Sequence, residues 1–149
     1  MRVDEVPERI VVDASVGLKW VLREQHSDRA VALGPGRELL TSALFWAESG
    51  NAIATRMRRG DLDEAAASEA FQDLQTVPLR TRPLDGAAAA TALAIARDLM
   101  HPIYDCCYLA LAIEENSIVI TADRRFRSAV AAHPALADRV VLLHDITLR

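Results

Sequence analysis

The chain has 149 residues, 51% of them hydrophobic and 26% charged, which predicts one globular domain over residues 1–149 with a normal core. Its formal net charge of −4 argues against a protein that coats nucleic acid by bulk attraction, but not against nucleic-acid chemistry where a divalent cation supplies positive charge. No apolar run is long enough to span a bilayer, and charged residues precede the first apolar run, so we expect no membrane contact and no signal peptide. Two adjacent cysteines form a poor disulfide framework and fit a reducing cytoplasm.

Short apolar runs alternate with helical patterns along the chain. Strand patterns cover residues 10–12, 38–41, 77–81, 118–121 and 140–143, and Pro78 places the third strand at a sheet edge. Helical patterns cover residues 16–24, 27–33, 43–59, 64–75, 84–100, 106–113 and 124–132, and Ser42 is expected to cap the third helix. This alternation predicts an α/β fold, a three-layer α/β/α sandwich with a short central parallel sheet.

Four acids are predicted to gather at one edge of this sheet. Asp13 and Asp123 each follow a strand directly, and all strands of a parallel sheet end at the same edge. A helix that leads into a parallel strand begins at that edge too, and Asp105 lies in the first turn of such a helix. The long helix after the second strand also begins there, and Glu48 lies within its first two turns. Ligand sites in open α/β sheets form at this edge.

A cluster of carboxylates requires a compensating charge, because each member raises the pKa of the others. Mg²⁺ and Mn²⁺ are hard cations that prefer carboxylate oxygen and water as ligands. Water bound to such a cation is acidified and can attack phosphorus. The acids therefore predict a Mg²⁺ or Mn²⁺ site that hydrolyses phosphodiester bonds. The histidines have no ligand spacing, so zinc is not expected.

Segments around the four acids carry a family resemblance. They are Val12-Asp13-Ala14-Ser15-Val16 with Lys19-Trp20, Glu48 with Asn51, Tyr104-Asp105 followed by Tyr108-Leu109-Ala110-Leu111-Ala112, and Thr121-Ala122-Asp123 with Phe126. In this order they resemble the PIN-domain family, and within it the VapC-type toxins of toxin–antitoxin pairs. The resemblance implies a small α/β/α sandwich with a Mg²⁺- or Mn²⁺-dependent ribonuclease site, a homodimer and a cognate antitoxin.

The resemblance also implies a role for each matching residue. Asp13 and Asp105 would be direct metal ligands, Asp123 a ligand directly or through water, and Glu48 a water-bridged ligand or a base. The positions that would line the site and orient the acids are Ser15, Asn51 and Thr121.

Three of the four acids also have a local explanation that involves no site, whereas Glu48 lies on an apolar stripe where a carboxylate needs a partner. Asp13 and Asp123 could each cap the helix that follows, and Asp105 could be a first-turn acid favoured by the helix dipole. The same holds for the residues around them, because serine, asparagine and threonine are common in turns and caps. Taken alone, Asp13 and Glu48 favour a site, Asp105 is neutral and Asp123 favours a cap, and the four acids taken together favour a site most strongly.

The leading hypothesis is a metal-dependent endoribonuclease that leaves a 5′-phosphate and a 3′-hydroxyl. Lys19, Arg124 and Arg125 are candidates for RNA contacts, although basic residues of this kind are often simply solvated. The resemblance adds a toxin role in the cytoplasm. The alternatives are a non-catalytic RNA- or protein-binding module with the same fold, and a DNA-directed structure-specific nuclease.

Overall fold

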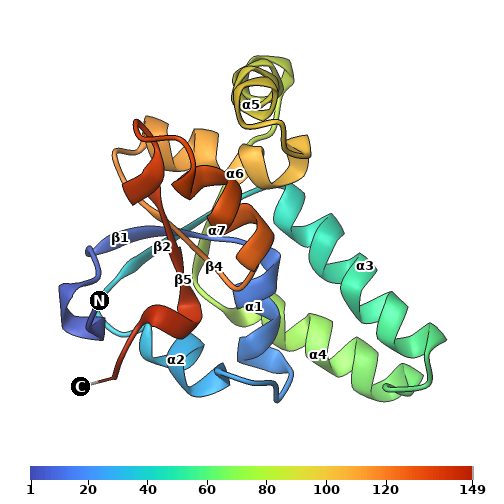
Figure 1. The fold of residues 1–149 in the computed structure, drawn as a ribbon. Coiled ribbons are helices and arrows are strands. Elements are labelled where there is room, and N and C mark those ends of the chain that lie inside the picture. The colour runs from blue at the N-terminus through green and yellow to red at the C-terminus, as the bar shows by residue number, and fades with distance from the viewer. Residues whose placement is uncertain (149) are drawn as a thin grey trace.

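The computed structural model describes residues 1–148 and contains a five-stranded sheet with helices on both faces (Figure 1). The strand order is β3-β2-β1-β4-β5, and every neighbouring pair is parallel. The strands are β1 (Arg9–Val12), β2 (Glu38–Ser42), β3 (Leu79–Arg82), β4 (Val119–Thr121) and β5 (Val140–Leu142). The predicted sandwich with a short parallel sheet is confirmed, and β3 lies at a sheet edge as expected.

Seven α-helices surround the sheet in the described part of the chain. They are α1 (Ala14–Val21), α2 (Ser27–Ala32), α3 (Leu44–Arg58), α4 (Glu64–Thr76), α5 (Gly86–Leu99), α6 (Ile103–Glu114) and α7 (Arg124–Ala131). Figure 1 shows α3 and α4 as a pair that extends from the body of the molecule, with α5 lying outside α6. Within residues 1–148, no helix combines the length and the apolar character needed to cross a bilayer.

The sheet is apolar on both faces because helices cover both of them. Side chains alternate across a strand, so Ile10 and Val12 of β1 pack with α1 and α2, whereas Val11 packs with α6 on the other face. Helix α6 is buried from Cys106 to Ala112, since the sheet covers one side of it and α5 covers another. This all-round burial explains why its sequence is apolar on every side.

Four helix starts differ from the predictions, because α1, α3, α5 and α6 begin at residues 14, 44, 86 and 103 where 16, 43, 84 and 106 were expected. The expectation that Ser42 is the N-cap residue of the long helix is wrong, because Ser42 ends β2 and Ala43 is the N-cap residue of α3. The Ser42 hydroxyl nevertheless accepts a hydrogen bond from the Leu44 N–H (3.3 Å), which satisfies one donor of the first turn. Helix α5 begins at Gly86, not at residue 84, because the Asp85 carboxylate caps it.

The strand order reverses at β1, and this reversal locates the crevice that open α/β sheets use for ligands. The chain leaves β1 for β2 on one side and later enters β4 on the other side. The register pairs Val12 of β1 with Ile120 of β4. The next residues along these strands, Asp13 and Thr121, therefore lie side by side at the carboxyl edge.

Candidate active site

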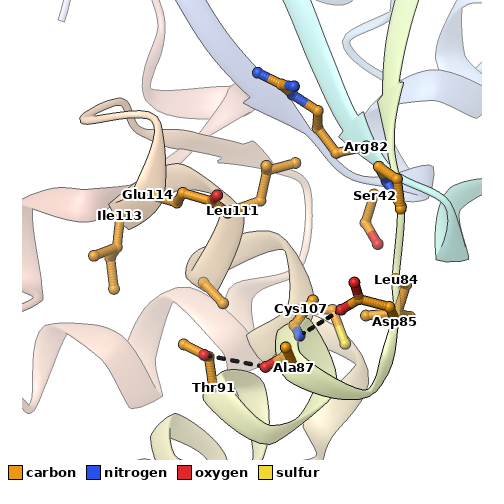
Figure 2. Close-up of a pocket in the computed structure, with 13 residues that line it drawn as sticks. Ser42, Arg82, Leu84, Asp85, Ala87, Thr91, Cys107, Leu111, Ile113 and Glu114 are labelled. Carbon is orange, nitrogen blue, oxygen red and sulfur yellow. Dashed lines mark hydrogen bonds between the residues drawn. The ribbon is translucent and has the colours of Figure 1, made fainter.

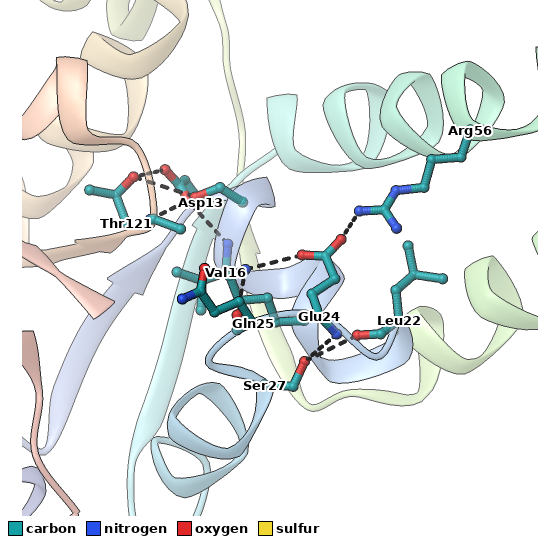
Figure 3. A network of polar contacts seen from close by, with 11 residues as sticks. Asp13, Val16, Leu22, Glu24, Gln25, Ser27, Arg56 and Thr121 are labelled. Carbon is teal, nitrogen blue, oxygen red and sulfur yellow. Dashed lines mark hydrogen bonds and ion pairs between the residues drawn. The ribbon is translucent and has the colours of Figure 1, made fainter. Parts of the chain in front are cut away.

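Asp13 is a buried carboxylate at the end of β1. Only 4% of the residue is exposed, and its carboxylate accepts hydrogen bonds from the Ser15 hydroxyl (2.5 Å), the Val16 N–H (3.2 Å) and the Thr121 hydroxyl (Figure 3). Burial raises the pKa of Asp13 to about 6, against the effect of these three hydrogen bonds. Asp13 thus caps α1, as one explanation expected, and also presents a desolvated carboxylate at the strand-order reversal.

Glu48 lies in the second turn of α3 and is half-buried. The hydroxyl of Tyr108, from α6, donates a hydrogen bond to Glu48 Oε1 (2.5 Å). Burial raises the pKa of Glu48, and the charge of Asp105 raises it further, whereas the Tyr108 hydrogen bond lowers it. The sequence places Tyr108 in a segment of the family resemblance, and only the structure shows its contact with Glu48.

Asp105 lies in the first turn of α6, and its partner is a histidine that sequence reasoning dismissed. His101 Nε2 is 2.6 Å from Asp105 Oδ2, and the His101 ring stacks on Phe126 with 5.5 Å between ring centroids. Burial raises the pKa of Asp105, His101 lowers it, and the charge of Asp123 raises it. His101 lies outside α6, just before the N-cap residue Pro102, so the pairing depends on how the chain enters the helix.

Asp123 caps α7 and is linked to Asp13 through one hydroxyl. Its carboxylate accepts hydrogen bonds from the N–H groups of Arg125 (2.8 Å) and Phe126 (3.2 Å). The backbone N–H of Asp123 donates to Thr121 Oγ1 (3.0 Å), and the same hydroxyl donates to Asp13. Thr121 therefore holds the ends of β1 and β4 in a fixed relation.

The four acids interact electrostatically, with Asp105 at the centre. The charge of Asp105 raises the pKa of both Asp13 and Glu48, and the charge of Asp123 raises the pKa of Asp105. Interactions of this kind weaken with distance and with solvent exposure. The charges of these four residues, which lie at the end of β1, in α3 and α6 and just before α7, thus influence one another, and we call the four residues the acid site.

The residues predicted to orient the acids have different surroundings. Ser15 donates to Asp13 and accepts a hydrogen bond from the Ala122 N–H (2.8 Å), so it joins the ends of β1 and β4 as Thr121 does. Asn51 is exposed one turn beyond Glu48. Its side chain makes no hydrogen bond to an acid of the site in residues 1–148, and its orienting role stays a prediction.

The three predicted RNA contacts also differ. Lys19 is partly buried, and its ammonium donates to Glu24 Oε2 (3.1 Å) and to the Gln25 carbonyl (2.9 Å). Glu24 also pairs with Arg56 of α3, as Figure 3 shows. By contrast, Arg124 and Arg125 are exposed at the start of α7, directly after Asp123. The two arginines are therefore the better candidates for a phosphate backbone.

A separate pocket of about 520 Å³ lies between α5, α6 and the ends of β2 and β3 (Figure 2). Its lining includes Ser42, Arg82, Cys107 and Leu111, but none of the four acids. The acid site is therefore distinct from this pocket and lies at the carboxyl edge of the sheet.

The donor set of the acid site suits a hard divalent cation. Carboxylate oxygens are the ligands that Mg²⁺ and Mn²⁺ prefer, and the mutual repulsion of the acids is the kind that a cation would relieve. In the described residues, no three histidine, cysteine or acidic side chains converge into a ready metal-binding group. The carboxylates of Asp13, Glu48 and Asp123 accept hydrogen bonds from donors of the protein, and Asp105 is paired with His101.

Comparisons with known proteins agree with this architecture. The PIN domain family model matches residues 10–131. No curated protein sequence matches the chain significantly.

Several solved structures share the fold. PAE2754 from Pyrobaculum aerophilum has 20% identity and a TM-score of 0.69, over 91% of this chain and 84% of that chain. A toxin–antitoxin complex from Klebsiella pneumoniae has 14% identity and a TM-score of 0.64, over 90% and 97%. VapC20 of Mycobacterium tuberculosis, a sarcin–ricin loop cleaving toxin, has 16% identity and a TM-score of 0.64, over 80% and 94%. At these identities, the likeness describes the fold alone.

Proposed function

The chain belongs to the PIN domain family of nucleases, and from this premise we propose that it is a Mg²⁺- or Mn²⁺-dependent endoribonuclease. The observation that supports this proposal most directly is the acid site itself. Its four carboxylates come from separate parts of the chain, and the charge of Asp105 raises the pKa of Asp13 and of Glu48, while the charge of Asp123 raises the pKa of Asp105. A nuclease that uses bound water needs such a group of acids and no nucleophilic side chain.

Asp13, Asp105 and Asp123 would hold the cation, and Glu48 would orient the attacking water or accept its proton. When bound, the cation would supply an acidified water and stabilise charge on the leaving oxygen. Ser15 and Thr121 keep Asp13 in place at the end of β1. Arg124 and Arg125 would contact the phosphate backbone beside the reacting group.

A toxin role in the cytoplasm, a cognate antitoxin and a homodimer complete the proposal. The family resemblance suggests them, and one of the structures with this fold is described as a toxin–antitoxin complex. A non-catalytic binding module would bind RNA without cleaving it. A DNA-directed nuclease would cleave DNA in preference to RNA.

The test is cleavage of single-stranded RNA by the purified protein. We expect cleavage with Mg²⁺ or Mn²⁺, none in EDTA, and a loss of at least about 100-fold in Asp13→Asn and Asp105→Asn, as typical of residues that act directly on the reaction. Asp63→Asn is the matched control, because Asp63 caps α4 in the same manner but is exposed and outside the acid site. Equal cleavage in EDTA, or unchanged rates in both acid variants, would refute the metal mechanism.

Two further comparisons separate the alternatives. Single- and double-stranded DNA are tested beside RNA, and preferential DNA cleavage would reject the ribonuclease proposal. If the chain is a toxin, we expect a small gene immediately upstream to encode its antitoxin. For this test, the chain is expressed with and without that gene. Growth arrest that this neighbour does not relieve would reject the antitoxin assignment.

A further inference from the structure

We propose that Tyr108 is a positioning residue of the acid site, whose hydroxyl holds the Glu48 carboxylate in its working orientation. This inference rests on the proposed nuclease function. The contact that carries it is the 2.5 Å hydrogen bond from the Tyr108 hydroxyl to Glu48 Oε1. It joins α6 to α3, two elements that each contribute an acid to the site.

The ring of Tyr108 is rigidly placed. The residue is completely buried and belongs to the same core cluster as Val11, Phe45 and Phe126. Because a close-packed core leaves a side chain little freedom, the position of the hydroxyl is set by packing against the sheet. A flexible glutamate is thus bonded to a rigid donor, which is how a supporting residue fixes a functional one.

Glu48 depends on this one partner. Among residues 1–148, Tyr108 is the only side chain that donates a hydrogen bond to Glu48, and Glu48 forms no salt bridge. Without the Tyr108 hydroxyl, the half-buried Glu48 carboxylate would still be repelled by the charge of Asp105. It would lower its free energy by turning toward water. Tyr108 therefore opposes the repulsion that the acid site creates.

A tyrosine suits this role better than a cationic residue. Its neutral hydroxyl fixes the carboxylate and leaves the negative charge available to a cation or to a bound water. Burial, together with the charge of Glu48, raises the pKa of the Tyr108 phenol far above its ordinary range, so the hydroxyl keeps its proton and stays a donor. Tyr108 also lies three residues after Asp105, so one face of α6 carries both an acid and the support of another acid.

The first test is kinetic and uses Tyr108→Phe, which removes only the hydroxyl. We expect kcat for RNA cleavage to fall by about 10- to 100-fold, the usual cost of losing such a supporting contact, with an unchanged KM. Tyr104→Phe is the matched control on the same helix, because Tyr104 is 58% exposed, and it should cleave at the wild-type rate. In a Glu48→Gln background, Tyr108→Phe should cause little further loss, since both changes remove the same contact.

The second test observes the contact without turnover. The chain has two tyrosines, so protein labelled with ¹³C at the tyrosine ζ carbon gives two signals, and Tyr104→Phe identifies the one from Tyr108. Glu48→Gln should shift the Tyr108 signal and leave the Tyr104 signal in place. This measurement needs only folded Glu48→Gln protein and stays informative if Tyr108→Phe fails to fold.

The outcomes separate the inference from the nuclease proposal. A wild-type protein that cleaves RNA while Tyr108→Phe cleaves equally well would overturn the positioning role alone. An undiminished loss from Tyr108→Phe in the Glu48→Gln background, or a Tyr108 signal that ignores Glu48→Gln, would also overturn it. A wild-type protein that cleaves no RNA would instead refute the proposed function.

Discussion

Replacing Asp13 by asparagine is expected to stabilise the folded protein at neutral pH while removing its activity. The Asp13 carboxylate is buried, and its pKa rises from the ordinary 3.8 to about 6. At about 1.4 kcal/mol for each tenfold change in proton affinity, keeping this group ionised at pH 7 costs about 3 kcal/mol of folding free energy. Asparagine avoids this cost because it carries no charge.

The gain is smaller than the full cost, because asparagine replaces one acceptor oxygen by an NH₂ group. In Asp13 one carboxylate oxygen accepts from the Ser15 hydroxyl and the Val16 N–H, and the other accepts from the Thr121 hydroxyl. Whichever oxygen the NH₂ group replaces, it would therefore face a hydrogen-bond donor. Such a mismatch costs about 1–2 kcal/mol, which leaves a net stabilisation of roughly 1–2 kcal/mol. For a chain of this length, the melting temperature at pH 7 should rise by roughly 2–8 °C.

The pH dependence follows from the direction of the pKa shift. Because the folded pKa exceeds the unfolded one, the folded state binds the proton more tightly, and stability falls as pH rises from about 3.8 to about 6. The advantage of Asp13→Asn should therefore be absent near pH 4, grow up to pH 6 and stay constant above it. The pKa values of Glu48 and Asp105 are also raised, but both groups titrate in the wild type and in Asp13→Asn. Their contributions to stability therefore largely cancel when the two proteins are compared.

Thermal melts in EDTA from pH 4 to pH 7.5 measure this difference, with Asp63→Asn as the exposed capping control. Saturating Mg²⁺ should raise the melting temperature of the wild type more than that of Asp13→Asn, because binding to the folded state adds stability only where the site is intact. The prediction fails if Asp13→Asn melts at a lower temperature than the wild type at pH 7. It also fails if the difference between the two melting temperatures does not depend on pH, because the Asp13 carboxylate would then not have a raised pKa in the folded protein.

Three further predictions concern the rest of the site and the core. Thr121→Val removes a buried donor and should lower the free energy of unfolding by about 1–3 kcal/mol in a urea titration; an unchanged midpoint would contradict the hydrogen-bond assignment. Gly17→Ala would place a Cβ atom against the buried ring of Phe45 and should lower the free energy of unfolding by about 1–3 kcal/mol. Gly86→Ala, with open space around it, should not destabilise the protein. Arg124→Ala combined with Arg125→Ala should weaken RNA binding and reduce the salt dependence of log K by about 1–2, at an unchanged melting temperature. A preserved RNA affinity would leave the two arginines as solvated charges.

The overall fold was predictable because its signals are local. Every strand except the edge strand β3 is built around a short apolar run, each long helix repeats its apolar residues, and the alternation of the two specifies a parallel sheet. The position of Asp13 and Asp123 at one edge follows from that topology alone. The misplaced cap at Ser42 shows the limit of local signals, since the pairing of β2 with β3 extends β2 through Ser42 and delays the start of α3.

The hydrogen-bond partners of the acids were less accessible to sequence reasoning. Tyr108 and Glu48 are 60 residues apart, and only the packing of α6 against α3 brings a phenol to a carboxylate. Lys19 looked available for RNA, but the loop after α1 turns back and places Glu24 against it. Contacts of this kind depend on how whole elements pack.

The sequence by itself therefore determined which elements form and at which edge of the sheet the acids lie. Both follow from the hydrophobic period of each segment and from the alternation of strands and helices along the chain. Tertiary structure alone decided how deeply each acid is buried and which donor it meets. Burial and hydrogen bonding control the charge of a carboxylate, and both arise from atoms that distant segments bring together, as Thr121 does for Asp13.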